Sequence, residues 1–201
     1  PAAALMTDLQ TNGAAESDRL RAQVELARIT LLRGDKPAAL DQLNTVITQD
    51  SSNAEALLLR GAIMLTDSKF DNVISDARAI LHGNPNSVGA LMLLSKAYIA
   101  TGEGDLAIDT LRSLLRVAPS DVDAHLELAS LLAAKSPDDA LDQLDAAIAL
   151  RPKATELKVQ KAEFLIRTGS PDKAEIIGQD FLKDAALSAV GHRIMGEAAL
   201  A

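Results

Sequence analysis

The sequence repeats itself with a period of about 34 residues, and this period constrains the fold more than any other feature. Small residues recur along the chain at Ala27, Gly61, Ser95, Ala129, Ala162 and Gly196. A second register has the same steps, at Ala39, Val73, Ala107, Ala140 and Ala174. A third register marks the end of each unit, at Ser51, Pro85, Pro119 and Pro152. Because three registers share one period, the chain is a repeat protein.

One repeat is a residue shorter than the others. The shorter step occurs once in every register, always at the fourth unit. Ser136 and Ser170, each followed by Pro-Asp, are again a full period apart. The fourth unit therefore lacks one residue, and the missing position lies before Ser136.

The third unit, residues 88–121, contains two amphipathic helical patterns. One covers residues 90–100 and the other residues 106–117, with a glycine-containing turn at residues 101–105 and Pro119 at the end. Glycine releases the chain from a helix, and aspartate caps the helix that follows. Helices this short do not bury their apolar faces alone, so each unit must stack on its neighbours. The pattern predicts an all-α protein of stacked helix–turn–helix units.

These registers resemble the tetratricopeptide repeat family, which has a helix–turn–helix unit of about 34 residues. The resemblance is strongest in the third unit, which has the family's residue types at Leu91, Leu94, Ser95, Tyr98, Gly102, Ala107, Leu111, Leu114 and Pro119. The chain departs from the family in having no tryptophan, and aliphatic residues take the usual aromatic places. The resemblance implies an all-α, right-handed superhelical solenoid of about twelve helices.

The registers also divide the chain. We expect five complete repeats within residues 19–188, at 20–53, 54–87, 88–121, 122–154 and 155–188. Residues 1–18 are expected to contain a helix of an incomplete repeat, and residues 189–201 the first helix of a truncated sixth repeat. The sequence does not begin with methionine, so we expect it to be part of a longer protein.

The residues that usually carry chemistry are few and scattered. There is no cysteine, and the three histidines, His82, His125 and His192, lie in different units without the i, i+4 spacing of a helical metal site. No phosphate-binding loop or nucleophile elbow is present. His125 takes an inward position that is leucine in other units, which favours a packed, hydrogen-bonded histidine. We expect no catalysis, no cofactor and no metal.

Charge and hydropathy narrow the class of partner. The net charge is −8 and the isoelectric point is near 4.9, and there is no basic stripe. Nucleic-acid binding needs Lys and Arg against phosphates, so nucleic acid is not expected as a partner. No apolar run reaches the roughly 18 residues of a membrane span. A protein or peptide is the expected partner.

The resemblance implies a concave groove lined by the first helices, and its positions can be carried over residue by residue. The first row is aliphatic: Val24, Leu58, Met92, Leu126 and Val159. The second row, one helical turn further on, is mixed: Arg28, Ala62, Lys96, Ser130 and Glu163. We expect the first row to form an exposed apolar stripe. A third row, Leu31, Leu65, Ile99, Ala133 and Ile166, either lines the groove or packs against the next helix.

These features predict a non-catalytic protein–protein interaction scaffold whose concave apolar groove binds a peptide or helix of a partner. Two alternatives stay open: a structural module that self-assembles through its terminal repeats, and an appendage of an enzyme whose catalytic domain lies elsewhere. Alanine- and leucine-rich arrays resemble the repeat regions of bacterial envelope proteins used in exopolysaccharide export, which implies an envelope location. Residues 1–18 do not have the pattern of a signal peptide, so a cytoplasmic location also stays open.

Overall fold

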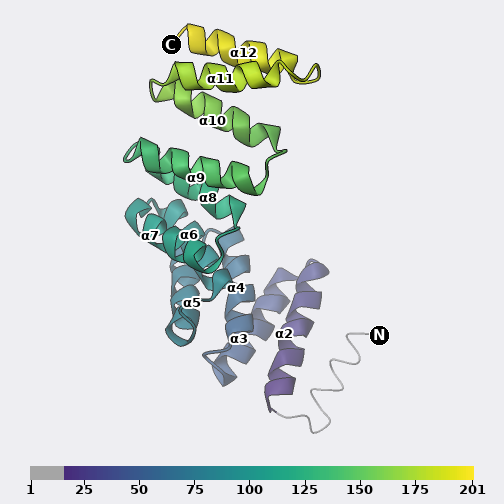
Figure 1. Ribbon diagram of the computed structural model, residues 1–201. Helices are drawn as coiled ribbons and strands as arrows, with labels where there is room; N and C mark the ends of the chain where they lie inside the picture. Colours follow the sequence, from purple (N-terminus) through teal and green to yellow (C-terminus); the bar gives the residue numbers. More distant parts are fainter. Residues whose placement is uncertain (1–15) are drawn as a thin grey trace. The chain divides into compact units, whose positions relative to one another are not determined.

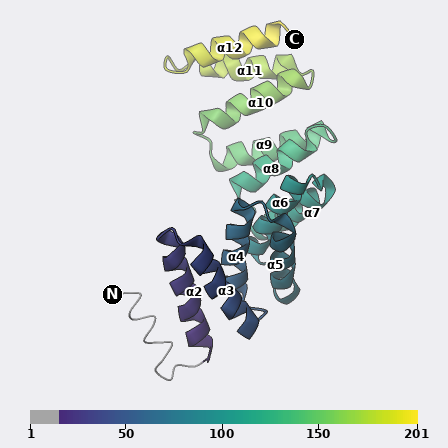
Figure 2. The same cartoon turned by 180° about the vertical axis from the view of Figure 1, so that it is seen from behind.

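A computed structural model describes residues 16–201, which form eleven α-helices and no strand (Figures 1 and 2). The helix expected at the N-terminus, before residue 16, lies outside the described residues. Ten of the helices pair into five hairpins. The first helices are α2 (Glu16–Leu32), α4 (Ala54–Thr66), α6 (Val88–Thr101), α8 (Val122–Leu132) and α10 (Thr155–Arg167). The second helices are α3 (Lys36–Gln49), α5 (Phe70–Gly83), α7 (Gly104–Val117), α9 (Pro137–Leu150) and α11 (Pro171–Phe181). The remaining helix, α12 (Ser188–Ala199), packs against α11.

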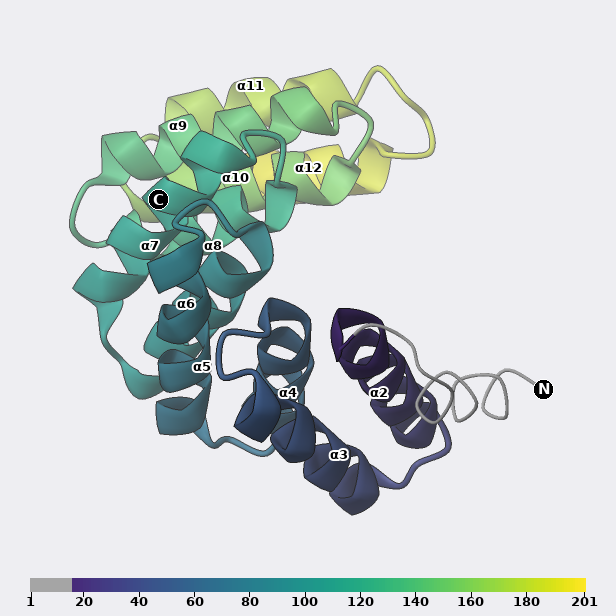
Figure 3. The ribbon, with the colours of Figure 1, turned by 90° about the horizontal axis from the view of Figure 1, so that it is seen from below.

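The helices gather into two compact units, one up to Val117 and one from Ala118. In the first unit α3 packs against both α2 and α4, and α4 also contacts α6 directly (Figure 3). In the second unit α9 packs against α8 and α10, and α10 contacts α12. Each hairpin therefore buries its apolar face against a neighbouring hairpin, and the predicted all-α fold of stacked helix–turn–helix repeats is confirmed.

The small residues of the repeat lie where helices approach each other. The second register is buried throughout, and the first register is buried from Ala27 to Ala162. A Cβ atom at Gly61 would lie 2.9 Å from Cδ1 of Leu93 on α6, so a larger side chain there would have to displace the end of the Leu93 side chain. Gly196 of α12 keeps the register but is exposed. The register therefore marks the close crossings in the five hairpins.

The turn inside each hairpin uses a residue in the left-handed conformation, except in the fourth. Positive φ angles occur at Gly34, Ser68, Gly102 and Gly169, which share one register position. The fourth repeat has no such residue in its turn, because the chain between α8 and Ser136 is the segment from which one residue is missing. Because the turn is shorter, α8 ends sooner than the first helices of the other repeats.

The shortened turn changes the end of α8. This helix has 11 residues, whereas α10 has 13. The amides of Lys135 and Ser136 both donate to the carbonyl of Leu132, at 2.9 and 2.8 Å, and close the turn without a positive φ angle. Ala133 therefore follows the helix directly, on the side of α8 that faces α10.

Candidate functional site

The ten predicted groove residues lie on first helices of both compact units. The first unit contains six of them: Val24 and Arg28 on α2, Leu58 and Ala62 on α4, and Met92 and Lys96 on α6. The second unit contains four: Leu126 and Ser130 on α8, and Val159 and Glu163 on α10.

The first row is less exposed than expected. Val24 is fully buried in a core cluster with Leu20 and Leu43, and the other four members of the row are half-buried. Leu58 lies under α6, since a Cβ atom at Gly89 would be 3.0 Å from its Cδ2. The expected exposed stripe is therefore interrupted at Val24, which is buried, and at Leu58, which the first helix of the next repeat covers.

The second row stays at the surface of the first unit. Arg28, Ala62 and Lys96 are all exposed. The guanidinium of Arg28 contacts the carboxylates of Glu25 on α2 and Glu55 on α4, both at 3.3 Å. Arg28 therefore links two first helices as an exposed ion pair, which stabilises little on its own.

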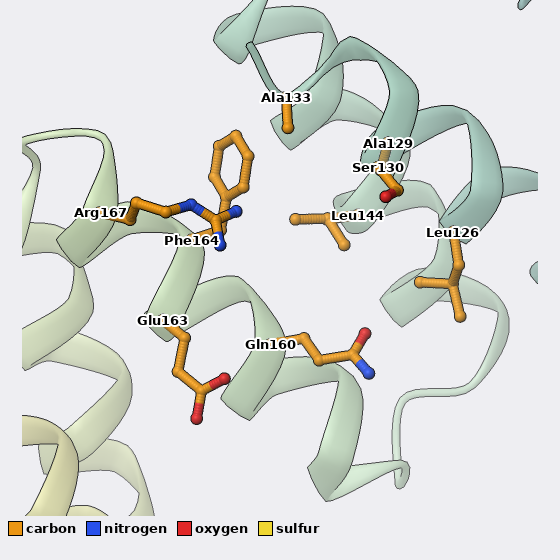
Figure 4. A pocket seen from close by; sticks show the side chains of 9 residues that line it. All are labelled: Leu126, Ala129, Ser130, Ala133, Leu144, Gln160, Glu163, Phe164 and Arg167. Atoms are coloured by element: carbon orange, nitrogen blue, oxygen red, sulfur yellow. The ribbon is translucent and has the colours of Figure 1, made fainter. Parts of the chain in front are cut away.

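The second unit contains a cleft between α8 and α10 that brings three predicted residues together. It has a volume of about 290 Å³. Its lining comes from α8, from the residue after α8, from α9 and from α10: Leu126, Ala129, Ser130, Ala133, Leu144, Gln160, Glu163, Phe164 and Arg167 (Figure 4). Val159, the fourth predicted residue, packs instead against the core cluster formed by Ala162, Leu165 and their neighbours. We refer to this space as the α8–α10 cleft.

Small side chains on one wall explain why the cleft is open. Ala133 occupies the third-row position, where the other four repeats have leucine or isoleucine. In Figure 4 its methyl group faces the ring of Phe164 across the space that a larger side chain would fill. Ser130 and Ala129 on the same wall are also small. The shortened turn and these short side chains therefore act together to open the fourth repeat.

The cleft has an apolar floor and a polar rim. Leu126, Leu144 and Phe164 form the floor. On the rim, the guanidinium of Arg167 lies 5.4 Å from the ring centroid of Phe164, and no carboxylate among residues 16–201 pairs with it. The Ser130 hydroxyl and the Gln160 amide make no hydrogen bond within the described part of the chain.

Glu163 is the only carboxylate that lines the cleft, and it is already engaged. Nη2 of Arg193 on α12 donates to its Oε1 at 3.1 Å, while Nη1 donates to Glu197 at 2.8 Å. The hydrogen bonds to Glu197 and Glu163 hold the pKa of Arg193 above its ordinary value. The rim therefore keeps one cation without a carboxylate partner, Arg167, one helical turn from a carboxylate that Arg193 already neutralises.

Sequence reasoning missed five lining residues: Ala129, Leu144, Gln160, Phe164 and Arg167. The opening at Ala133 could have been found from the sequence, because Ala133 is the only small residue in a third row that is otherwise leucine and isoleucine. The position of Arg167 over Phe164 could not have been found in this way, because it depends on where α10 ends.

The remaining sequence candidates are structural. His125 is buried as expected, with Nδ1 2.8 Å from Oε1 of Gln143 and Nε2 3.1 Å from the carbonyl oxygen of Pro119. Among residues 16–201, no three His, Cys, Asp or Glu side chains gather in a way that could hold a metal ion. No helix in that range is both long and apolar enough to cross a membrane.

Comparison with known families decides the classification. A sequence model described as a tetratricopeptide repeat matches residues 64–130 and 131–192, which is more than half of the chain. The chain belongs to the tetratricopeptide repeat family. No curated protein sequence matches it.

Solved structures with the tetratricopeptide fold resemble the chain in fold but not in sequence. Residues 41 to the end of MamA from Desulfovibrio magneticus RS-1 are 17% identical with a TM-score of 0.72, covering 83% of this chain and 94% of that one. YrrB, described as a TPR protein with an unusual peptide-binding site, is 16% identical with a TM-score of 0.74, covering 96% and 100%. A thermophilic TPR protein of Thermus thermophilus is 22% identical with a TM-score of 0.56, covering 90% and 100%. At these identities the likeness establishes the fold alone.

Proposed function

We propose that this chain is a non-catalytic protein–protein interaction scaffold, and that the α8–α10 cleft binds a peptide segment or helix of a partner. One observation carries the proposal: Leu126, Ser130 and Glu163, which the family resemblance implies as groove residues, line one cleft. Family membership supports a protein partner. YrrB, a neighbour in fold, is itself described as having an unusual peptide-binding site.

The lining of the cleft suits an apolar side chain of a partner together with the polar backbone groups beside that side chain. An apolar residue of the partner fits against Leu126 and Phe164, because burying it removes apolar surface from water. Ser130 and Gln160 offer hydrogen bonds to the partner's backbone at the rim. A concave apolar site with a few convergent polar groups is the common form of a binding pocket.

The same lining argues against catalysis. Ser130 is the only hydroxyl in the cleft, and no histidine lines it to act as a base. Glu163 is held by Arg193 and does not face a second carboxylate. Members of this family are in general non-catalytic scaffolds, which agrees with the proposed role.

Filling the cleft with the residue type found in other repeats tests the proposal. Ala133→Leu places in the fourth repeat a side chain that Leu31 and Leu65 already provide in the same register, so the fold is expected to tolerate it. Ala134→Leu, at the exposed neighbouring position outside the cleft, is the matched control. The wild-type chain and both variants are immobilised to capture proteins from a lysate of the source organism. Proteins captured by the wild type are then identified and purified.

We expect Ala133→Leu to weaken binding of the captured partner by at least about tenfold and Ala134→Leu by less than about twofold. Circular dichroism must show the same helicity for all three proteins. A partner that binds folded Ala133→Leu as tightly as the wild type would overturn the assignment of this cleft.

A second candidate function, self-assembly, is favoured by one observation on α12. Gly196 stands at the small-residue position that is buried in every other repeat, yet no atom of another helix in the described range lies within 4 Å of a Cβ built on it. A helix from a second copy would cover this face. Sedimentation velocity over a range of concentrations distinguishes the two functions, since only self-assembly predicts a rise in mass that Gly196→Arg abolishes.

A further inference from the structure

A second cleft lies on the opposite side of α10, between α9, α10 and α11. It has a volume of about 380 Å³ and shares no residue with the α8–α10 cleft. Lys158 and Lys161 of α10 are separated by a single helical turn and therefore lie on one face of that helix. Lys183, after α11, is the third lysine in the lining. We refer to this space between α9, α10 and α11 as the lysine cleft.

Lys158 is out of place for this repeat position. The equivalent residues in the three preceding repeats are Leu57, Leu91 and His125, and all three are buried. Lys158 is half-buried, and no hydrogen bond or close ion pair joins its ammonium group to any residue in the described part of the chain. Replacing a core residue by a cation without a partner costs free energy, because the charge is partly removed from water.

The other two lysines of the cleft are already neutralised. Nζ of Lys161 donates to Asp145 on α9, and Nζ of Lys183 donates to Asp180 on α11 at 3.0 Å. The hydrogen bond and charge of Lys183, with a smaller contribution from the charge of Lys158, hold the pKa of Asp180 below its ordinary value. Two lysines and two aspartates cancel, so the cleft retains the positive charge of Lys158 within a chain of net charge −8.

An exposed apolar side chain lies in the same cleft. Ile176 on α11 is 65% exposed, although most isoleucines of the chain are buried or half-buried. Ile148 and Ile177 line the cleft beside it and are half-buried. A cation without a hydrogen-bonded partner and an exposed isoleucine therefore occur together, on a surface that no described residue covers.

We propose that the lysine cleft docks a protein segment that carries a carboxylate next to an aliphatic side chain. The carboxylate binds the ammonium group of Lys158, and the aliphatic side chain covers Ile176. Charge complementarity selects an acidic segment, and the exposed isoleucine selects an aliphatic neighbour. This surface is independent of the α8–α10 cleft, so one chain can hold two partner segments at once.

Selection of peptides tests the proposal without knowledge of the natural partner. A displayed library of random short peptides is selected on the wild-type chain, with Lys158→Met present as a soluble competitor to remove peptides that bind elsewhere. Lys158→Met is expected to fold, because leucine fills the same position in two other repeats. Enriched peptides are synthesised and their affinities measured by fluorescence anisotropy. The controls are Lys173→Met, an exposed lysine of α11 outside both clefts, and Ala133→Leu, which fills the α8–α10 cleft.

The expected peptides carry Asp or Glu beside Ile, Leu or Val. They should bind Lys158→Met at least about tenfold more weakly than the wild type, and both controls within about twofold. Peptides without an acidic residue, peptides indifferent to Lys158→Met, or no enriched peptide at all would overturn the proposal. Loss of binding in Ala133→Leu instead would assign the peptides to the α8–α10 cleft, so the two proposals fail separately.

Discussion

Arg60 on α4 binds the carboxylate of Asp76 on α5 through both of its oxygens. Nε lies 2.9 Å from Oδ2 and Nη2 lies 2.6 Å from Oδ1, and Asp76 is only 3% exposed. Nη1 of the same guanidinium donates to Oδ1 of Asn44 on α3 at 2.8 Å. One side chain therefore joins three helices from two consecutive repeats, and it satisfies a charge that would otherwise be buried alone.

Removal of Arg60 should be strongly destabilising, and a second substitution should rescue it. Arg60→Leu leaves the buried Asp76 charge without a partner, which is expected to lower the free energy of unfolding by about 3–5 kcal/mol. In the next repeat the same two positions are Leu94 and Thr110, so Arg60→Leu/Asp76→Thr reproduces a pair that the fold already uses. We expect the double variant to recover at least half of the loss in urea unfolding. A double variant as unstable as the single one would contradict this account.

Replacing the turn residue Ser68 by glycine should make the protein more stable. It has a φ of 56°, in the left-handed region, whereas the equivalent positions are Gly34, Gly102 and Gly169. A side chain in this conformation is strained by its Cβ atom, so Ser68→Gly is expected to raise the free energy of unfolding by about 1 kcal/mol. The reciprocal change, Gly102→Ser, should lower it by a similar amount. Thermal unfolding of both variants checks the prediction, and equal melting temperatures would refute it.

Two glycines of α12 should respond oppositely to the same substitution. A Cβ atom at Gly191 would lie 2.7 Å from the backbone oxygen of Gly178 and 2.9 Å from Cδ2 of Leu182, so Gly191→Ala must separate α11 from α12. We expect it to cost about 1–3 kcal/mol. Gly196→Ala meets nothing within 4 Å and should stabilise by about 0.5–1 kcal/mol through helix propensity. Urea unfolding curves that shift the same way for both would show that the α11–α12 contact is misplaced.

Asp50 should make stability depend on pH in the acid range. Its carboxylate accepts hydrogen bonds from the Ser52 hydroxyl at 2.8 Å and the Ser52 amide at 3.0 Å, and these lower its pKa below the ordinary 3.8. A pKa that is lower in the folded state means that the carboxylate stabilises the fold above its unfolded pKa and that this contribution is lost as the pH falls through the folded value. The destabilisation caused by Asp50→Ala should therefore be constant at neutral pH and shrink below about pH 4. Unfolding measured across this range tests it, and a constant difference down to low pH would count against it.

Part of the candidate site was predictable because the repeat register fixes which helix face a residue occupies. The family resemblance, carried along the repeat register, implied Leu126, Ser130 and Glu163 as groove residues, and they line the same cleft. The register does not report how closely the next first helix approaches. Val24 shares the row of Leu126 but is fully buried, because α4 and α3 contribute to the core around it.

The sequence by itself determined the period, the pairing of helices into hairpins and the burial of the small-residue registers. These are local properties that recur in every repeat, and each recurrence carries the same signal. Only the tertiary structure decided which positions depart from the repeat. The register marks Gly196, and not Gly191, as a close crossing, but a backbone oxygen of α11 lies against Gly191 and no neighbouring atom lies within 4 Å of a Cβ at Gly196. The α8–α10 cleft and the ion pair of Arg60 with Asp76 are also visible only in the tertiary structure, because each is formed by residues on different helices.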